Sequence, residues 1–495
     1  MVPPLRDSAC DTSSPRNHED LKSNPTYMGR LFINIENCLS DLGVDTNCDD
    51  CIKKMEEMAV FIHESMSISA RNYHSVQHVF DISKDMTEPI PILAALFHDC
   101  IYYHVDGEFS LRQAEKLKGA MIPIENSPNC RLPLHAGCDD LIDMVISIFG
   151  WNDGQELTPM TGLNEFLSAV IAVRELQSLL PLYILAQIAC CIEATIPFRP
   201  TNDADGSPMD RLFAKICLTN EKFQLGMTEE ELVRAVQQAA LVCNQDVENF
   251  GTEDRAWFLD NTWSLLPESN AALRSQHLYS VQEFQYAVFK MYGFFCFLKA
   301  PVVFQNFRGY PTNQELERLR KNAARNIEVG RRYVAAKVLS LSVLAAFAEL
   351  TGGDAPMSMF KGDLPSRNRV SIRLGERIPS HNHDDLANSS KCDMEVYDLL
   401  VKGRKSETSF DMRSSPLAAY FYGILGDEGV ENILSSIKVY PMTSETATKL
   451  LQALPLNAMR KVAEQMAFVA RSRAEHIHRL VKTITSEQER EYFFL

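Results

Sequence analysis

The spacing of apolar residues is the feature that most limits what this chain can fold into. Apolar residues recur at intervals of three and four along almost the whole sequence, as in YVAAKVLSLSVLAAFAEL from Tyr333, and alternating runs between turn residues are rare. Intervals of three and four follow one face of an α-helix, whereas alternation follows one face of a strand. The sequence therefore predicts an all-α fold.

The bounds of the main helices follow from the same spacing. In the first half we expect helices over Met28 to Leu42, Ile52 to Ala70, Ser75 to Met86, Ile90 to Tyr103, Asn164 to Leu179, Leu182 to Ala194 and Glu229 to Asn249, and a further set runs from Val281 to Leu350. With 45% apolar and 23% charged residues, the chain is typical of soluble proteins that bury a sizeable core. At 495 residues it should contain more than one domain.

Changes in composition divide the chain into segments. Residues 1–27 are rich in Pro, Ser, Asp and Asn without a long apolar run, which predicts a flexible arm and no secretory signal. Residues 353–415 are rich in Gly, Pro, Ser, Asn and Asp, which predicts an irregular linker. Between and after these segments we expect a helical domain over 28–265, a helical extension packed on it over 266–352, and a C-terminal helical unit over 416–495.

Charge and cysteine usage restrict partners and compartment. The formal charge is -16 and dense Lys/Arg runs are absent from the sequence, which argues against affinity for nucleic-acid phosphates or anionic lipid. The longest apolar runs carry charged residues and are shorter than a bilayer span, so we expect no membrane segment. Thirteen scattered cysteines predict reduced thiols and a cytoplasmic location.

One pair of cysteines has the CxxC spacing. Cys48 and Cys51 would need a second pair of soft ligands to hold a structural zinc, and only Cys38 and His63 lie near them in the sequence. We therefore favour cysteines at a helix end over a zinc site.

The stretch RNYHSVQHVFDI, Arg71 to Ile82, places His74 and His78 four residues apart on a predicted helix. Residues four apart lie on one face of a helix, so both imidazoles can address one point in space. By itself, such a pair is more often a surface or capping feature than part of a metal site.

A second stretch, ILAALFHDCIYY, Ile92 to Tyr103, ends a strongly apolar run with His98 and Asp99. An imidazole beside a carboxylate is costly to bury unless a partner satisfies both groups, and a divalent cation would do so. The alternative is a His-Asp pair that caps the end of the helix.

Together these blocks resemble the HD superfamily of metal-dependent phosphohydrolases. RNYHSVQH and AALFHD are followed by GLNEFLSA from Gly162, which is similar to the NExxSA helix of one branch, by CIEATIPF from Cys191, similar to its IxxT helix, and by ALVCNQDVENF from Ala240, similar to its late Asp-bearing helix. The resemblance covers residues 70–250 and implies an HD-domain-like helical bundle with an additional helical C-terminal region. A long insertion before NEFLSA, and Pro-Phe-Arg where the family often has a His, depart from the pattern and leave the substrate open.

The resemblance also implies a ligand set. It assigns His78, His98, Asp99 and Asp246 to one divalent metal ion, whose identity we expect to be Mn, Fe, Co, Ni or Mg. Such an ion would activate water for attack on a phosphate ester.

Three more residues have implied catalytic roles, each with an alternative. His74 matches the histidine that cyclic-nucleotide phosphodiesterases of the superfamily use as general acid, or it makes a hydrogen bond to a carboxylate. Glu165 would orient a ligand histidine or the water, or it forms a salt bridge. Thr195 would bind the water, or it bonds back to the preceding helical turn.

Two arginines flank the blocks. Arg71 and Arg199 would bind the substrate phosphate, or they form ordinary ion pairs, and Glu193 is expected to pair with an arginine.

The leading hypothesis is hydrolysis of a phosphate ester, with a nucleotide or another small phosphorylated metabolite as substrate and a homo-oligomer left open. One rival is a diiron oxygenase on the HD fold, in which His104 or His135 would reach a second metal. Another is a regulatory or binding module in which a metal site only supports the structure.

Overall fold

The computed structural model describes residues 26–125, 127, 129–134, 139–275, 278–361 and 373–493, so almost all of the predicted arm lies outside the described residues. Helices dominate this part of the chain, and its strands form one small antiparallel sheet of β1 (Ile122–Pro123), β2 (Cys130–Arg131) and β3 (Glu156–Leu157). The predicted all-α fold is confirmed.

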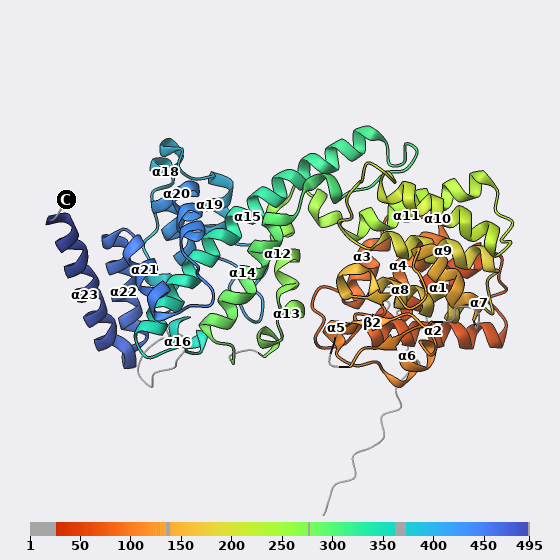
Figure 1. Cartoon of the computed structure of the whole chain (residues 1–495), viewed down its shortest axis with the longest axis horizontal. Coiled ribbons are helices and arrows are strands. Elements are labelled where there is room, and N and C mark those ends of the chain that lie inside the picture. Colours follow the sequence, from red (N-terminus) through yellow and green to blue (C-terminus); the bar gives the residue numbers. More distant parts are fainter. Residues whose placement is uncertain are drawn as a thin grey trace, which may run out of the picture.

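Buried apolar residues form two separate clusters, and Figure 1 shows the two corresponding lobes along the long axis of the molecule. The N-terminal lobe surrounds the cluster that runs from Leu31 to Cys243 and also includes Phe307. The C-terminal lobe surrounds the cluster from Phe250 to Ile484. The chain therefore has two hydrophobic cores, and the motifs of the sequence analysis lie in the first.

The N-terminal lobe packs its helices around α9. Every residue of α9 from Ile184 to Ala194 is buried, and the helix packs against α4, α8 and α11. The helices of this lobe are α1 (Tyr27–Asp41), α2 (Asp49–Met66), α3 (Val76–Ser83), α4 (Pro89–Phe97), α5 (Tyr103–Asp106), α6 (Leu111–Lys116), α7 (Asp140–Phe149), η1 (Pro159–Thr161), α8 (Leu163–Leu176), α9 (Leu182–Ala194), α10 (Pro208–Lys222) and α11 (Glu229–Asp246).

Two helix ends position the site. Helix α4 starts with a proline, where the missing N–H costs nothing, and ends at Phe97, so that His98 is its C-cap. Helix α11 starts with a capping box between Thr228 and Glu231 and ends at Asp246. The last residue of α11 and the end of α4 thereby face each other inside the lobe.

The C-terminal lobe is built on the long helix α15, which lies beside α14, α20 and α21. Its helices are η2 (Glu248–Gly251), α12 (Arg255–Ser264), α13 (Leu266–Ser269), η3 (Ala271–Arg274), α14 (Val281–Phe297), η4 (Ala300–Val302), α15 (Asn313–Leu350), α16 (Met357–Lys361), α17 (Leu374–Arg377), α18 (His383–Ser389), α19 (Met394–Lys402), α20 (Pro416–Ser436), α21 (Ser444–Ala453), α22 (Leu456–Val469), η5 (Arg471–Arg473) and α23 (Ala474–Phe493). Helix α15 is long and apolar enough to cross a membrane, but 89% of its apolar window is buried within the protein.

The structure corrects the predicted segments after residue 250. The described part of 353–415 holds α16 to α19, and Val396, Leu400 and Phe410 from this stretch are buried in the C-terminal core. The predicted extension over 266–352 and the predicted C-terminal unit over 416–495 both contribute to this one core. The core begins at Phe250, which precedes the predicted domain boundary at 265. The linker prediction was wrong because Gly and Pro indicate where a chain turns, and they do not indicate whether the short helices between the turns are buried.

Candidate metal centre

Two histidines and two aspartates converge inside the N-terminal lobe. His78 lies on α3, His98 caps α4, Asp99 follows it, and Asp246 ends α11. His78 Nε2 lies 3.2 Å from Asp246 Oδ1 and 3.7 Å from Asp99 Oδ2, and His98 Nε2 lies 2.9 Å from Asp99 Oδ2 and 3.6 Å from Asp246 Oδ1. Each histidine therefore lies near both aspartates, although the residues come from three helices far apart in sequence.

The ring of His98 is oriented by the helix that carries it. Its Nδ1 lies 2.9 Å from the carbonyl of Ala95, which can only accept, so Nδ1 carries a proton and Nε2 is the nitrogen that would offer a lone pair to a metal. Within the described residues, His98 Nε2 and Asp99 Oδ2 are buried and not aligned in a hydrogen bond, although they are 2.9 Å apart. Buried polar atoms without partners are costly, and a cation bound between them would satisfy both.

The electrostatics of this protein without metal agree with that chemistry. Burial alone would raise the pKa of both aspartates, but the charge of His98 and neighbouring imidazoles holds the pKa of Asp99 well below its usual range. The hydrogen bond with His78 and the nearby imidazole of His98 likewise outweigh burial and lower the pKa of Asp246 to about 2. Two ionised carboxylates beside imidazoles supply two negative charges, which a divalent cation would neutralise.

His74 lies next to the centre but not on the expected helix, which begins at Val76 after the N-cap Ser75. Its ring centroid is 5.5 Å from that of His78, and its Nε2 is 3.9 Å from Asp99 Oδ2. Burial would lower the pKa of His74, but the charges of Asp99 and Glu268 outweigh burial and raise it. His74 thus lies beside the centre, but a contact with another part of the chain, and not the helix, holds its ring.

The residue that holds the ring of His74 is Glu268, which the sequence analysis did not identify. Its Oε2 lies 2.6 Å from His74 Nδ1, and its Oε1 accepts the backbone N–H groups of Asn72, Tyr73 and His74 at 2.7, 2.7 and 3.0 Å. Burial would raise the pKa of Glu268, but the charge of His74 and these hydrogen bonds lower it. Its position in SLLPES, among apolar residues, signals a buried carboxylate, but sequence alone cannot name a partner 194 residues away.

Glu165 lies in the first turn of α8, and its Oε2 is buried with no hydrogen-bond partner among the described residues. Burial, and then the charges of Asp99 and Asp246, raise the pKa of this carboxyl to about 7. The salt bridge offered as its alternative role is not found in the described part of the chain. Glu165 instead belongs to the electrostatic surroundings of the centre.

Arg71 is not placed to bind a substrate phosphate. Its side chain is fully buried, with Nε 2.8 Å from Oδ1 of Asp106 and Nη2 2.5 Å from Oδ2. Its Nη1 donates to the backbone carbonyl of Asp99 at 2.6 Å. The prediction of phosphate binding is therefore corrected, because these contacts make Arg71 a support for the loop that carries Asp99.

Arg199 also has a structural partner. It donates to both carboxylate oxygens of Glu193 at 2.6 and 3.0 Å, and Lys215 Nζ lies 2.9 Å from the same carboxylate. Glu193 is completely buried, so it requires these cations. The ion pair that the sequence analysis left open is the arrangement observed, and it leaves phosphate binding by Arg199 an untested prediction.

Thr195 also takes the second of its two predicted arrangements. Its Oγ1 donates to the carbonyl of Ile192 at 2.8 Å, one turn back along α9. A hydroxyl used in this way holds the end of the helix, so the prediction that it binds the water is not supported by the geometry.

The remaining candidate ligands lie apart from this cluster. Cys48 is the N-cap of α2, and its Sγ accepts from the N–H of Cys51, as expected of cysteines at a helix end. His104 is exposed and packs on Tyr102, with ring centroids 4.7 Å apart, and His135 lies outside the described residues. In the described part of the chain, the groups able to hold a metal are His74, His78 and Asp99, and His78, His98 and Asp246.

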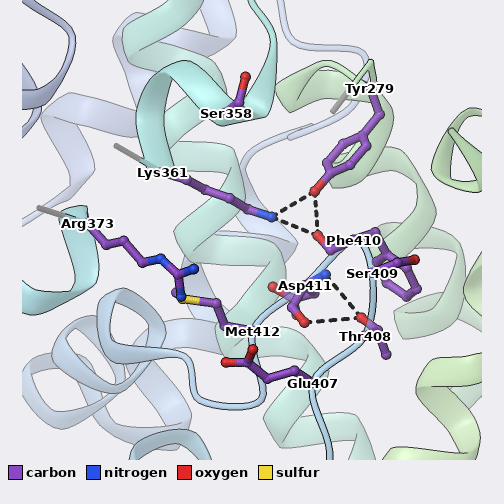
Figure 2. A pocket seen from close by; sticks show the side chains of 10 residues that line it. All are labelled: Tyr279, Ser358, Lys361, Arg373, Glu407, Thr408, Ser409, Phe410, Asp411 and Met412. Carbon is purple, nitrogen blue, oxygen red and sulfur yellow. Dashed lines mark hydrogen bonds between the residues drawn. The ribbon is translucent and has the colours of Figure 1, made fainter. Parts of the chain in front are cut away.

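A separate cavity of about 330 Å³ lies in the C-terminal lobe (Figure 2). There Lys361 Nζ points to the hydroxyl of Tyr279 and the carbonyl of Phe410, each at 2.7 Å, and Thr408 bonds to Asp411. Its described lining does not include any of the metal-ligating groups above. We therefore take the N-terminal centre as the candidate site.

Comparisons with family models, with curated proteins and with solved structures return no match to this chain. The geometry of the centre is therefore the basis for assigning a function.

Proposed function

We propose that this chain is a metal-dependent phosphohydrolase of the HD type, which acts in the cytoplasm on a phosphate ester of a nucleotide or another small phosphorylated metabolite. The observation that carries the proposal is the convergence of His78, His98, Asp99 and Asp246, with His98 Nε2 and Asp99 Oδ2 buried and lacking aligned partners. Such a set is costly to bury without a cation.

The residues present fit one divalent ion. His78 Nε2, His98 Nε2 and an oxygen from each of Asp99 and Asp246 would hold it, and the mixed nitrogen and oxygen set suits Mn, Fe, Co, Ni or Mg. When bound, such an ion would polarise a phosphoryl oxygen and lower the pKa of water. The remaining contributions come from side chains of this chain.

His74 supplies a proton donor beside the ligands. Its Nδ1 is held by Glu268, which leaves Nε2 on the side of the ring that faces Asp99. Protonated His74 carries a proton at Nε2, which can pass to the leaving oxygen of an ester bound at the centre. Arg71 holds the backbone of Asp99 and Glu165 adds an acidic group nearby, so both act around the reacting atoms without touching the phosphate.

The two rival functions differ from this proposal in what they require. A diiron oxygenase needs ligands for a second iron. In the described part of the chain His104 belongs to neither group of metal-ligating side chains, and the two groups that occur share His78, so two irons would compete for that ligand. A regulatory module needs the metal but no proton donor. The orientation of His74 toward the ligands therefore favours hydrolysis over both.

The first test is metal analysis of the purified full-length protein, followed by a panel of phosphate esters. We expect about one ion per chain and metal-dependent release of phosphate by wild type. Loss of a ligand in Asp99→Asn should abolish tight metal binding and reduce turnover by roughly 10³-fold, because metal catalysis is worth several kcal/mol.

Three outcomes would contradict the proposal. Absence of bound metal together with absence of turnover would refute the metal centre. Bound metal without turnover of any ester would favour the regulatory module. Two irons per chain with consumption of oxygen would favour the oxygenase.

A further inference from the structure

We propose that the C-terminal lobe completes the N-terminal site, because Glu268 is the positioning residue that sets the ring orientation and tautomer of His74. This inference rests on the proposed function, in which His74 donates a proton. Glu268 lies outside residues 70–250, where the motifs occur, and on a helix of the other lobe.

The carboxylate of Glu268 binds the backbone segment that directly precedes α3. Three consecutive backbone N–H groups, from Asn72 to His74, donate to Oε1 of Glu268, and none of them has yet entered the helix. The N-cap Ser75 makes no side-chain capping bond, so the helix lacks its usual local anchor at this end. Without Glu268, these N–H groups would need other partners, and the position of His74 would no longer be determined.

The second oxygen of Glu268 determines the tautomer. An ionised carboxylate only accepts, so His74 Nδ1, at 2.6 Å from Oε2, must carry a proton. The other ring nitrogen, Nε2, is thereby the atom that faces Asp99. A carboxylate that orients a histidine in this way acts through the histidine and not on the substrate.

Glu268 is itself held from both lobes. Leu266, in the same short helix α13, is buried in the C-terminal core. Arg274 donates to the carbonyls of Pro267 and Glu268 at 2.9 Å each, and its third contact is the carbonyl of Val105 in α5, at 3.3 Å. Figure 1 shows α13 beside α5, where the lobes meet. The carboxylate is thus presented to His74 by a contact between the lobes.

The deciding variant is Glu268→Gln. Glutamine keeps the size and an oxygen for the backbone N–H groups, but its amide nitrogen donates, so His74 Nδ1 must accept and the ring must change tautomer. For an alkyl phosphate, whose leaving oxygen needs a proton, we expect kcat to fall by roughly 10²-fold or more while KM and metal content stay nearly constant. For a p-nitrophenyl ester, whose leaving group needs no proton, kcat should fall much less.

The tautomer can be read without any substrate. In protein labelled with ¹⁵N-histidine and freed of metal, the ring signals of His74 are assigned by their absence in His74→Gln. Wild type should show a protonated Nδ1 in a strong hydrogen bond, and Glu268→Gln should show an unprotonated Nδ1. The wild-type spectrum alone is decisive if the variant fails to fold.

The matched control is Glu229→Gln. Glu229 pairs with Arg308 from the second half of the chain at 3.5 Å, and both side chains are exposed. Losing this pair removes a contact of the same charge type without touching His74, so kcat on both esters should be unchanged.

An unprotonated Nδ1 in wild type would overturn the inference, as would equal losses on both esters in Glu268→Gln. If wild type hydrolyses no ester while His74 shows the expected tautomer, the proposed function fails and the positioning role of Glu268 stands.

Discussion

Each lobe buries a cluster of charged side chains, and the two clusters differ in the ratio of carboxylates to cations and in the type of cation. In the C-terminal lobe, Asp411 accepts hydrogen bonds from Lys337 Nζ at 2.6 Å, Trp263 Nε1 at 3.1 Å and Arg404 Nη1 at 3.4 Å. One carboxylate there faces two cations, and the neighbouring cations lower its pKa although burial would raise it. In the N-terminal lobe, two carboxylates face imidazoles, and two polar atoms lack an aligned partner.

This difference in charged groups distinguishes a structural ion-pair cluster from a candidate metal site. In the C-terminal cluster the positive charges are fixed on lysine and arginine side chains. In the metal-free N-terminal cluster the counter-charge is a proton on an imidazole, because the charge of Asp99 raises the pKa of His98 although burial would lower it. A divalent cation can replace such a proton. Burial of ionisable groups is therefore not the signal of function. Nor is a single unpartnered atom the signal, because Arg404 Nε in the C-terminal cluster also lacks a hydrogen-bond partner among the described residues. The signal is the convergence of several imidazole nitrogens and carboxylate oxygens, the atoms that bind divalent metals.

The largest effect on stability is expected in the C-terminal cluster. Asp411→Asn leaves Lys337 buried without its counter-charge and Arg404 with only Asp260, which should lower the free energy of unfolding by about 3–5 kcal/mol while metal content is unchanged. Urea unfolding at pH 7 measures the change. Asp254→Asn, which breaks an exposed pair with Lys405, is the control and should change stability by less than about 1 kcal/mol. Loss of metal in Asp411→Asn would show that the clusters are not independent.

The corresponding test of the N-terminal cluster is the variant His98→Gln, which removes one proposed metal ligand. The metal should stabilise wild type by about 3 kcal/mol when its free concentration is a hundred times its dissociation constant, because it binds only the folded chain. Without the Nε2 ligand the variant should gain almost none of this stabilisation. Thermal unfolding with and without the added ion compares the two proteins, and an equal gain in both would remove His98 from the ligand set.

A smaller effect concerns the dependence of stability on pH. The pKa of Glu165 is raised by burial and by Asp99 and Asp246 to about 7 in the folded protein, above its unfolded value. A raised carboxyl pKa means that the stability contribution is present below the unfolded pKa and is lost as pH rises toward the folded one. Metal-free wild type should therefore lose on the order of 2 kcal/mol between about pH 4.5 and 7, after a discount for partial exposure.

Glu165→Gln cannot ionise and should lack this loss. Urea unfolding of both metal-free proteins at pH 5 and pH 7.5 makes the comparison. The same decline in the variant would mean that another group titrates.

The smallest effect is expected for Thr195→Val. The substitution removes one hydrogen bond to the carbonyl of Ile192, which should cost about 1 kcal/mol of stability and leave metal affinity unchanged. Calorimetric titration with the metal checks the second point. A tenfold loss of affinity would restore the predicted role of Thr195 at the water.

Much of the N-terminal lobe could be predicted because the relevant information is local. Helix α9 spans Leu182–Ala194, as its helical spacing predicted, and the starts of α8 and α11 lie within one residue of expectation. His98 and Asp99 stood out because a His-Asp pair that ends an apolar run has to be buried. Periodicity failed one turn earlier, where His74 has helical spacing from His78 but precedes the helix.

Side-chain partners could not be predicted in the same way. Arg71 and Arg199 were expected at a phosphate because of their place in the sequence, and each is instead bound to a carboxylate, Asp106 and Glu193. An arginine beside a motif is compatible with both arrangements. Only the distances in the folded chain decide between them.

The sequence by itself determined that this protein is helical, because apolar spacing is a property of short stretches. It also predicted, through the resemblance of its motifs, a His and Asp set for a divalent metal. The tertiary structure decided which atoms meet. It brought Asp246 to His78 across 168 residues and Glu268 to His74 across 194 residues, from the other lobe. The first contact depends on how helices pack within the N-terminal core, and the second depends on how the two hydrophobic cores pack against each other. No interval between neighbouring residues encodes that packing.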